Sequence, residues 1–185
     1  PSGDFSFFDT TLDTAVLLNL VPKKYKELEL SPLETYFALA RGYQGEAGDV
    51  TALAMKKWFN TNYHYMVPEI DDETELQLVG STLVDTFKEA KTLGIKTCPT
   101  ILGPFTLLKL ATYHGQKGAE DFYQAAISAY SQLFTELSKE ECEWLQIDEP
   151  ALVLDLTQEE SKQFKILYQA LLAEKGDLNI LVQTY

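Results

Sequence analysis

The chain has 185 residues, of which 45% are hydrophobic and 12% aromatic, enough for one sizeable core and too much for a disordered segment. Its 28 acidic and 15 basic residues give a net charge of −13, which argues against nucleic acid as a partner because that binding needs clustered cations. No apolar run approaches the roughly 18 residues of a membrane helix, so we expect no membrane partner either.

Capping residues and apolar spacing predict four helices. The first begins at Ser31, where Ser31-Pro32-Leu33-Glu34 is a capping box with proline at the first helical position. Apolar side chains at helical spacing predict further helices over residues 73–93 and 122–137, and Gly94 ends the former. A second capping box, Thr157-Gln158-Glu159-Glu160, predicts a helix over residues 157–172.

Five strands are predicted between and beside these helices, at residues 4–8, 58–66, 95–102, 144–147 and 179–184. The last three are almost wholly apolar, as in a parallel sheet buried on both faces. Strand–helix alternation indicates an α/β fold. A closed eight-stranded barrel typically needs about 250 residues, more than this chain has. A doubly wound open sheet would fit the length, but no glycine-rich phosphate loop opens a helix here.

The segment with the densest mixture of aromatic and polar side chains is residues 56–69, K-K-W-F-N-T-N-Y-H-Y-M-V-P-E. It combines four aromatic rings with two amides, two lysines and a histidine, and each polar group taken into a core must find a partner. That mixture is typical of a surface that binds a flat, polar ligand. The competing interpretation is an amphipathic strand with a polar outer face.

Four ordered motifs resemble the amino-terminal half of cobalamin-independent methionine synthase. They are K-W-F-N-T-N-Y-H-Y-M-V-P-E, and then G-D-F-S-F-F-D at residues 3–9, L-G-P-F-T at 102–106 and Q-I-D-E-P-A-L at 146–152. The resemblance covers essentially the whole chain. It implies part of an enzyme that moves a methyl group from 5-methyltetrahydropteroyltri-L-glutamate to L-homocysteine, forming L-methionine without cobalamin.

The resemblance also implies the fold. Residues 1–185 would be a fragment of the amino-terminal (β/α) barrel, a partial TIM-type barrel with about strands 2–6, and the catalytic carboxy-terminal barrel would be absent. The chain begins at Pro1 without a methionine and stops after an apolar run, so we expect a piece of a longer polypeptide, inactive alone. The missing barrel would be its partner.

Lys57 is the candidate binding residue. The lysine before W-F-N-T-N-Y is implicated, in the family that the chain resembles, in holding the poly-γ-glutamyl tail of the folate. An ammonium group suits carboxylates, and an acidic protein must concentrate cations where it binds an anion. Lys56 either assists or is merely solvated.

Asp148 and Glu149 are adjacent carboxylates after an apolar strand, a pattern that alone suggests acid–base chemistry or a cation site. Neighbours on a strand point to opposite faces, so they cannot form the facing pair of a glycosidase. The resemblance implies a duplicated remnant of the catalytic half's I-D-E-P stretch. We favour a structural role and leave a ligand role for either residue open.

No metal site and no catalytic residue is predicted within the chain. His64 has no second histidine near it in the sequence, His114 lies in a loop-like stretch, and Cys98 and Cys142 lack metal-ligand spacing. The resemblance places zinc, as cofactor of the whole enzyme, in the carboxy-terminal barrel. Two cysteines are too few for a disulfide scaffold, which predicts a reducing, cytoplasmic setting.

Two other functions stay open. The chain could be a duplicated structural barrel that binds nothing, or a stand-alone barrel methyltransferase similar to uroporphyrinogen decarboxylase. Trp58, Phe59, Tyr63 and Tyr65 could stack on a pterin or fill the core, and aromatic strand residues are more often core.

Overall fold

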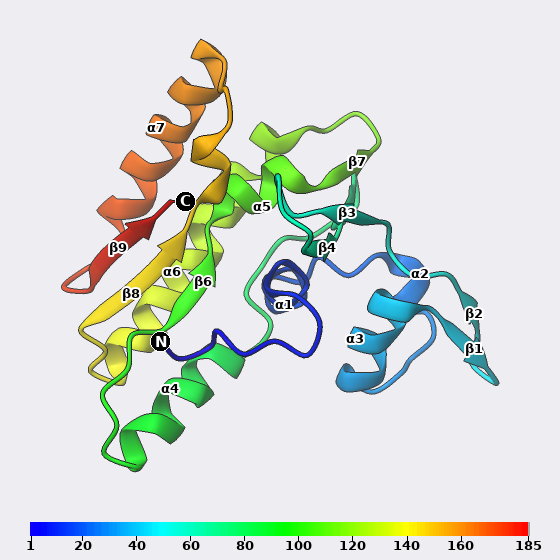
Figure 1. Cartoon of the computed structure of the whole chain (residues 1–185), viewed down its shortest axis with the longest axis horizontal. Helices are drawn as coiled ribbons and strands as arrows, with labels where there is room; N and C mark the ends of the chain where they lie inside the picture. Colours follow the sequence, from blue (N-terminus) through cyan, green and yellow to red (C-terminus); the bar gives the residue numbers. More distant parts are fainter. Residues whose placement is uncertain (185) are drawn as a thin grey trace.

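The computed structural model describes residues 1–184 as a mixed α/β fold with small sheets and no closed barrel among the described residues. Its principal sheet is parallel, in the order β6 (Thr100–Leu102), β8 (Trp144–Asp148) and β9 (Asn179–Gln183). Ser2 forms an isolated parallel bridge with Pro99, which extends this sheet beyond β6. Figure 1 shows β8 between its two neighbours, with β9 at the edge.

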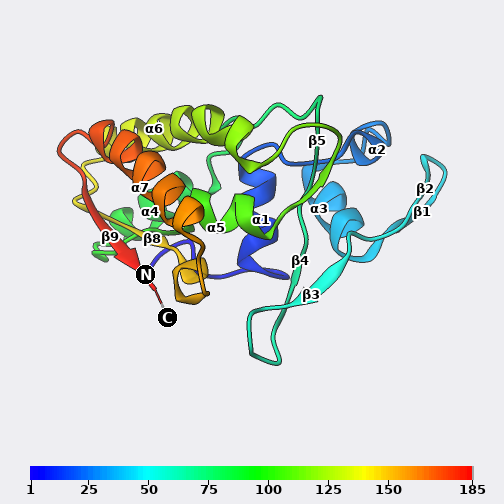
Figure 2. The same ribbon diagram turned by 90° about the horizontal axis from the view of Figure 1, so that it is seen from above.

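Helices α6 (Tyr123–Lys139) and α7 (Gln158–Ala173) connect the parallel strands and pack against each other. In the view of Figure 2, α6 and α7 lie together on one side of β8 and β9. Each helix turns an apolar stripe towards the core, with Tyr130, Leu133 and Leu137 of α6 and Leu171 of α7 at most 1% exposed. Both helices confirm the sequence prediction within two residues.

Helix α1 (Thr10–Leu17) occupies the middle of the molecule. It contacts β6, helix α3 (Pro32–Arg41), helix α5 (Pro104–Leu110) and strand β4 (His64–Met66). The short helix α2 (Lys23–Lys26) lies beside α3, and the hairpin of β1 (Tyr43–Gly45) and β2 (Gly48–Val50) projects at the end away from the principal sheet (Figures 1 and 2).

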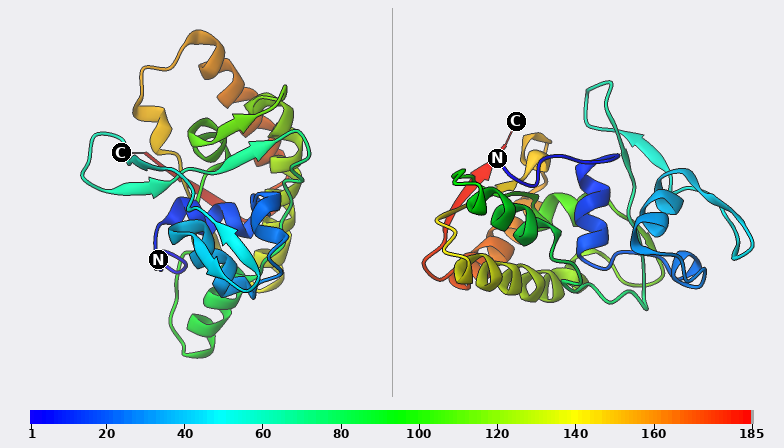
Figure 3. Two further views of the ribbon diagram at one scale, coloured as in Figure 1. Left: turned by 90° about the vertical axis from the view of Figure 1, so that its right-hand side faces the viewer. Right: turned by 90° about the horizontal axis from the view of Figure 1, so that it is seen from below.

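Two further strand pairs complete the fold. Strands β3 (Met55–Lys57) and β4 form an antiparallel hairpin, whose tip projects from the body in both panels of Figure 3. Strands β5 (Glu69–Asp71) and β7 (Thr112–His114) pair in parallel. Helix α4 (Thr82–Thr92) and two single turns of 3₁₀ helix, η1 (Ala119–Phe122) and η2 (Pro150–Val153), lie in the connections.

Several predicted elements were wrong or too long. Residues 4–8 form no strand; Phe5 and Phe7 are 82% and 66% exposed rather than packed in a sheet, and the chain enters α1 at Asp9. The predicted strand 58–66 is instead the turn and second strand of the β3–β4 hairpin. Of the predicted strand 95–102, only residues 100–102 form a strand, β6. The helix predicted from residue 73 begins at Thr82. Leu76 and Leu78 are buried, so their apolar character reflects a packed extended segment rather than a helix face.

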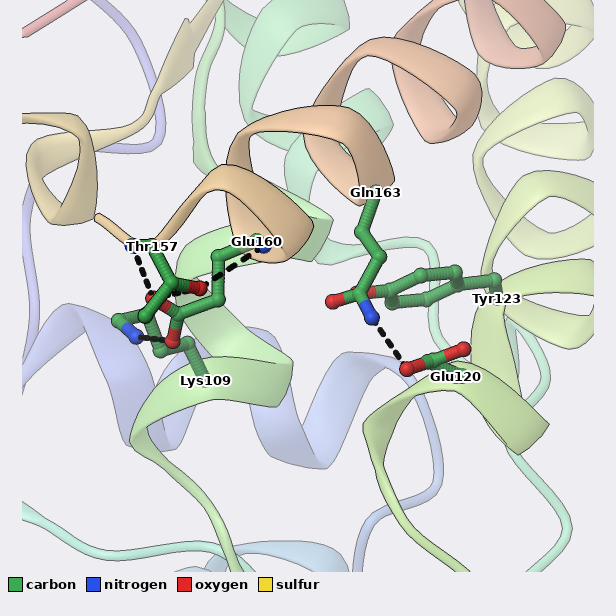
Figure 4. Close-up of polar contacts among 6 residues, drawn as sticks. All are labelled: Lys109, Glu120, Tyr123, Thr157, Glu160 and Gln163. Atoms are coloured by element: carbon green, nitrogen blue, oxygen red, sulfur yellow. Dashed lines mark hydrogen bonds and ion pairs between the residues drawn. The ribbon is translucent and has the colours of Figure 1, made fainter.

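The capping box of α7 also joins this helix to α5. The Thr157 hydroxyl accepts from Glu160 N at 3.1 Å, and the Glu160 carboxylate accepts from Thr157 N at 2.9 Å. Figure 4 shows that the same carboxylate also accepts a hydrogen bond from the Lys109 ammonium group of α5. Nearby, Gln163 bridges Glu120 and Tyr123, which ties α7 to η1 and the start of α6.

We expect Glu160→Gln to loosen the first turn of α7 in a pH-dependent way. The bond from Lys109, followed by the capping contacts, lowers the pKa of Glu160 from 4.5 to about 2. A depressed carboxyl pKa stabilises the folded state above the unfolded pKa, and this contribution is lost as pH falls from 4.5 towards 2. Hydrogen exchange of α7 should therefore differ between the full-length wild type and variant at neutral pH and converge in acid.

Glu159→Gln is the matched control, since Glu159 is 64% exposed and lies 3.8 Å from Lys162 in a solvated pair. Such pairs contribute little. A pH profile of Glu160→Gln that is indistinguishable from that of the control would contradict the assigned role of Glu160.

Candidate functional site

A cavity of about 420 Å³ gathers residues from all four sequence motifs. It lies where α1, the β3–β4 turn and the carboxyl ends of β6 and β8 meet, the edge at which parallel β/α folds bind ligands. The lining residues are Gly3, Asp4, Thr10, Asp13, Thr14, Trp58, Thr61, Tyr63, Thr100, Ile101, Leu102 and Asp148.

The turn of the β3–β4 hairpin brings the aromatic motif to this cavity. Trp58 N donates to Tyr63 O at 2.7 Å, and the Thr61 hydroxyl donates to Trp58 O at 2.6 Å, which closes the turn. Phe59 has a φ of 51°, the left-handed region that bulky residues rarely adopt. This conformation places Trp58 and Tyr63 of the motif in the cavity wall.

Asp9 ties the hairpin to α1. It is 0% exposed; one carboxylate oxygen accepts from Leu12 N at 2.9 Å as the helix cap, and the other accepts from Met66 N in β4 at 3.0 Å. Burial raises the pKa of Asp9, and backbone hydrogen bonds from Met66, Leu12 and Thr11 oppose that rise. Sequence reasoning missed α1 and this cap, although aspartate followed by an apolar-rich stretch is an N-cap signal that could have found them.

Glu149 lies behind the cavity, where it joins the end of β8 to α5 and α7. Its side chain is fully buried, and Phe105 N, Thr106 N, the Thr106 hydroxyl and the Tyr168 hydroxyl all donate to it, at 2.5–3.0 Å. A Cβ at Gly103 would lie 2.2 Å from this carboxylate, so only glycine fits there. The Gly-Pro motif therefore lets the end of β8 dock against α5 around the buried Glu149 carboxylate.

Asp148 points the other way and lines the cavity, as strand alternation predicts. Its Oδ1 accepts from Gln146 Nε2 at 2.8 Å. Burial raises the pKa of Asp148, and the charge of Asp4 raises it further. Asp148 and Glu149 thus have separate environments.

Lys57 is exposed and stands next to the cavity rather than in its lining. It pairs across the hairpin with His64, and the following residue, Trp58, forms part of the wall. Neither Lys56 nor Lys57 makes an ion pair with another described residue. Because neighbours on a strand point to opposite faces, the two ammonium groups are available to anions on opposite faces of the hairpin.

The remaining candidates divide between core and surface. Trp58 and Tyr65 are 7% and 4% exposed and pack edge-to-face at 5.7 Å, while Tyr63 is half exposed. His64 and His114 are exposed. Within residues 1–184, His, Cys, Asp and Glu side chains form no cluster of three or more that could hold a metal. Cys98 and Cys142 are free thiols.

The comparisons with known proteins identify the chain's class. The family described as "Cobalamin-independent synthase, N-terminal domain" matches residues 1–185. The chain belongs to this family. Its relatives include proteins of Streptococcus suis (54% identical over 185 residues), Lactococcus lactis (53% over 184) and Campylobacter jejuni (51% over 185), each named 5-methyltetrahydropteroyltriglutamate–homocysteine methyltransferase.

Each match covers all of this chain and 24–25% of the relative. The chain thus spans about a quarter of the length of the curated relatives it matches. Membership in this family does not favour the alternative that the chain is a stand-alone methyltransferase similar to uroporphyrinogen decarboxylase. Among the described residues, no helix is long and apolar enough to span a membrane.

Proposed function

We propose that this chain is part of an enzyme that transfers the methyl group of 5-methyltetrahydropteroyltri-L-glutamate to L-homocysteine. Identities of 51–54% with methyltransferases of that name, over the whole chain, support this activity for the full-length protein. The family's description indicates that the reaction needs no cobalamin. The chain alone would be inactive, and a biosynthetic enzyme of this kind would act in the cytoplasm.

The part of the function that we assign to this chain is capture of the glutamyl tail by Lys57. The tail carries several carboxylates, and this chain's net charge of −13 repels it except where a cation is exposed. Lys57 supplies such a cation beside a cavity of ligand-binding size, while Lys56, its neighbour on β3, points to the opposite face of the hairpin. The single observation that carries the proposal is an exposed Lys57 with no described ion-pair partner next to the cavity-lining Trp58.

The architecture that we propose is an arc of a (β/α) barrel, residues 1–185 being a fragment of one barrel domain. Three parallel strands joined by α6 and α7, with the Ser2–Pro99 bridge beyond β6, support a curved parallel sheet of this kind. The remainder of the polypeptide would supply the other strands and the catalytic barrel.

Zinc does not fit the residues of this chain. Thiolate and imidazole ligands must converge on one point, and the described residues offer no such cluster. When bound, zinc would favour the thiolate form of a thiol substrate, and any such site belongs to sequence outside residues 1–184. The contribution of this chain is scaffold and tail binding.

Replacing Lys57 by alanine in the full-length enzyme should raise the KM for the triglutamate donor about fivefold and leave the KM for homocysteine nearly unchanged. Removing one ammonium–carboxylate contact weakens binding of that substrate by about 1 kcal/mol, partly screened by solvent. Steady-state kinetics with each substrate varied in turn gives both constants. Lys162→Ala, which removes an exposed lysine of α7, is the control.

Equal KM values for wild type and Lys57→Ala would remove the role of Lys57. The competing proposal, a structural barrel that binds nothing, expects no saturable signal when the complete amino-terminal barrel is titrated with the folate triglutamate.

A further inference from the structure

A second basic side chain stands beside Lys57 on the projecting β3–β4 hairpin (Figure 3). The register of the two strands sets His64 directly opposite Lys57, and both residues are exposed. In the next pair along, Trp58 N donates to Tyr63 O at 2.7 Å. Hydrogen-bonded and non-hydrogen-bonded pairs alternate along an antiparallel ladder, so Lys57 and His64 form a non-hydrogen-bonded pair. Side chains of such a pair share one face, with Cβ atoms about 4.5–5.5 Å apart.

The hairpin turn orients the ring of His64. Its Nδ1 lies 3.0 Å from the main-chain oxygen of Asn62, and a carbonyl oxygen can only accept, so Nδ1 carries a proton. A neutral ring with its proton on Nδ1 presents a lone pair at Nε2, which repels a carboxylate. A doubly protonated ring presents an N–H and a positive charge there, and both favour a carboxylate. The protonation of this ring therefore decides whether the position repels or binds an anion.

We infer that His64 is a second, proton-dependent cation of the tail site, so that capture of the poly-γ-glutamyl tail strengthens in mildly acidic solution. This inference rests on the proposed function of Lys57 and adds a residue that favours tails with more than one glutamate. One ammonium group pairs with one carboxylate, whereas two neighbouring cations can hold two successive carboxylates of a tail. Two positive charges side by side repel each other, and a carboxylate between them offsets that repulsion. Proton uptake and tail binding therefore support each other.

Strand β3 and helix α1 pack against β4, and their other charged groups face elsewhere. Lys56 lies on the opposite face of the hairpin by strand alternation. Asp9, the cap of α1, is fully buried and already accepts two backbone hydrogen bonds. Asp13 of α1 lines the cavity, where a tyrosine hydroxyl donates to it. No ion pair among the described residues includes Lys57 or His64, so both can meet an anion.

The test is equilibrium titration of the full-length protein with folate triglutamate and with folate monoglutamate, at about pH 6 and about pH 8. Histidine changes charge in this range, while the carboxylates of the tail stay ionised. In the wild type, the preference for the triglutamate over the monoglutamate should be about fivefold larger at the lower pH. His64→Gln should keep the smaller preference at both pH values. His64→Lys, whose charge is constant in this range, should keep the larger one at both.

His114→Gln, which changes an exposed histidine of β7, is the matched control and should reproduce the pH response of the wild type. Circular dichroism checks that each variant is folded. A wild-type preference that is equal at the two pH values, or a pH response that is unchanged in His64→Gln, would overturn the role of His64. If Lys57→Ala still reduces the preference in that case, tail capture by Lys57 stands without His64. A wild type with no preference for the triglutamate would remove both.

Discussion

Replacing Glu149 by alanine should destabilise this domain by about 3 kcal/mol, the largest loss that we expect from a single polar side chain here. The change leaves four buried donors without an acceptor: Phe105 N, Thr106 N and the hydroxyls of Thr106 and Tyr168. It also opens a void between β8, α5 and α7. The loss is smaller than four separate hydrogen bonds because removing a buried carboxylate also removes its desolvation cost.

Native-state hydrogen exchange of β6 and β8 in the full-length protein measures this loss locally. Glu149→Gln should cost about half as much, because one side-chain oxygen still accepts while the amide nitrogen faces a donor. Asp155→Ala, an exposed carboxylate nearby in the chain, should change protection by less than about 0.5 kcal/mol. Equal protection in Glu149→Ala and Asp155→Ala would show that the buried network contributes nothing.

The pH dependence of the Glu149 contribution has the opposite sign to that of Glu160. Burial raises the pKa of Glu149 above 4.5, against the pull of its four donors. A raised carboxyl pKa stabilises the folded state most below the unfolded pKa, and this stabilisation is lost as pH rises through the folded pKa. The stability advantage of wild type over Glu149→Gln should therefore be largest below pH 4.5 and shrink as pH rises through the folded pKa.

Replacing Asp9 by alanine should cost about 2 kcal/mol and should also loosen the hairpin that carries Lys57. The change removes the cap of α1, worth about 1 kcal/mol, and leaves Met66 N in β4 without its acceptor. Because β4 pairs with β3 directly opposite Lys57, we expect faster hydrogen exchange in both strands. The KM for the triglutamate donor should rise as well.

Asp9→Asn separates the two contributions, since asparagine still caps a helix but cannot accept two bonds through two oxygens. It should restore the protection of α1 and only part of that of β4. Asp49→Ala, in the exposed β1–β2 hairpin, is the neutral control. Unchanged exchange in β3 and β4 of Asp9→Ala would contradict the anchoring role of Asp9.

Elements with strong local signals were predictable from the sequence. The capping boxes at Ser31 and Thr157 give α3 and α7 at the expected starts, and the apolar runs before Asp148 and after Asp177 give β8 and β9. These signals are local, so they survive in any tertiary context.

Elements whose character depends on distant partners were missed. The helical spacing of Leu76 and Val79 predicted a helix, yet the backbone there bonds to α1, where Gln77 N and Val79 N donate to Leu18 O and Leu17 O. The β3–β4 turn depends on the left-handed Phe59, which no turn motif indicates.

The relative affinity of the full-length protein for folate triglutamate and folate monoglutamate tests the proposed role of Lys57 most directly. Equilibrium titration of the wild type should show tighter binding of the triglutamate, and added salt should reduce that difference because exposed charges are screened. In Lys57→Ala the preference for the longer tail should fall about fivefold, with the affinity for the monoglutamate almost unchanged. A preference that is as large in Lys57→Ala as in the wild type would contradict capture of the tail by this side chain.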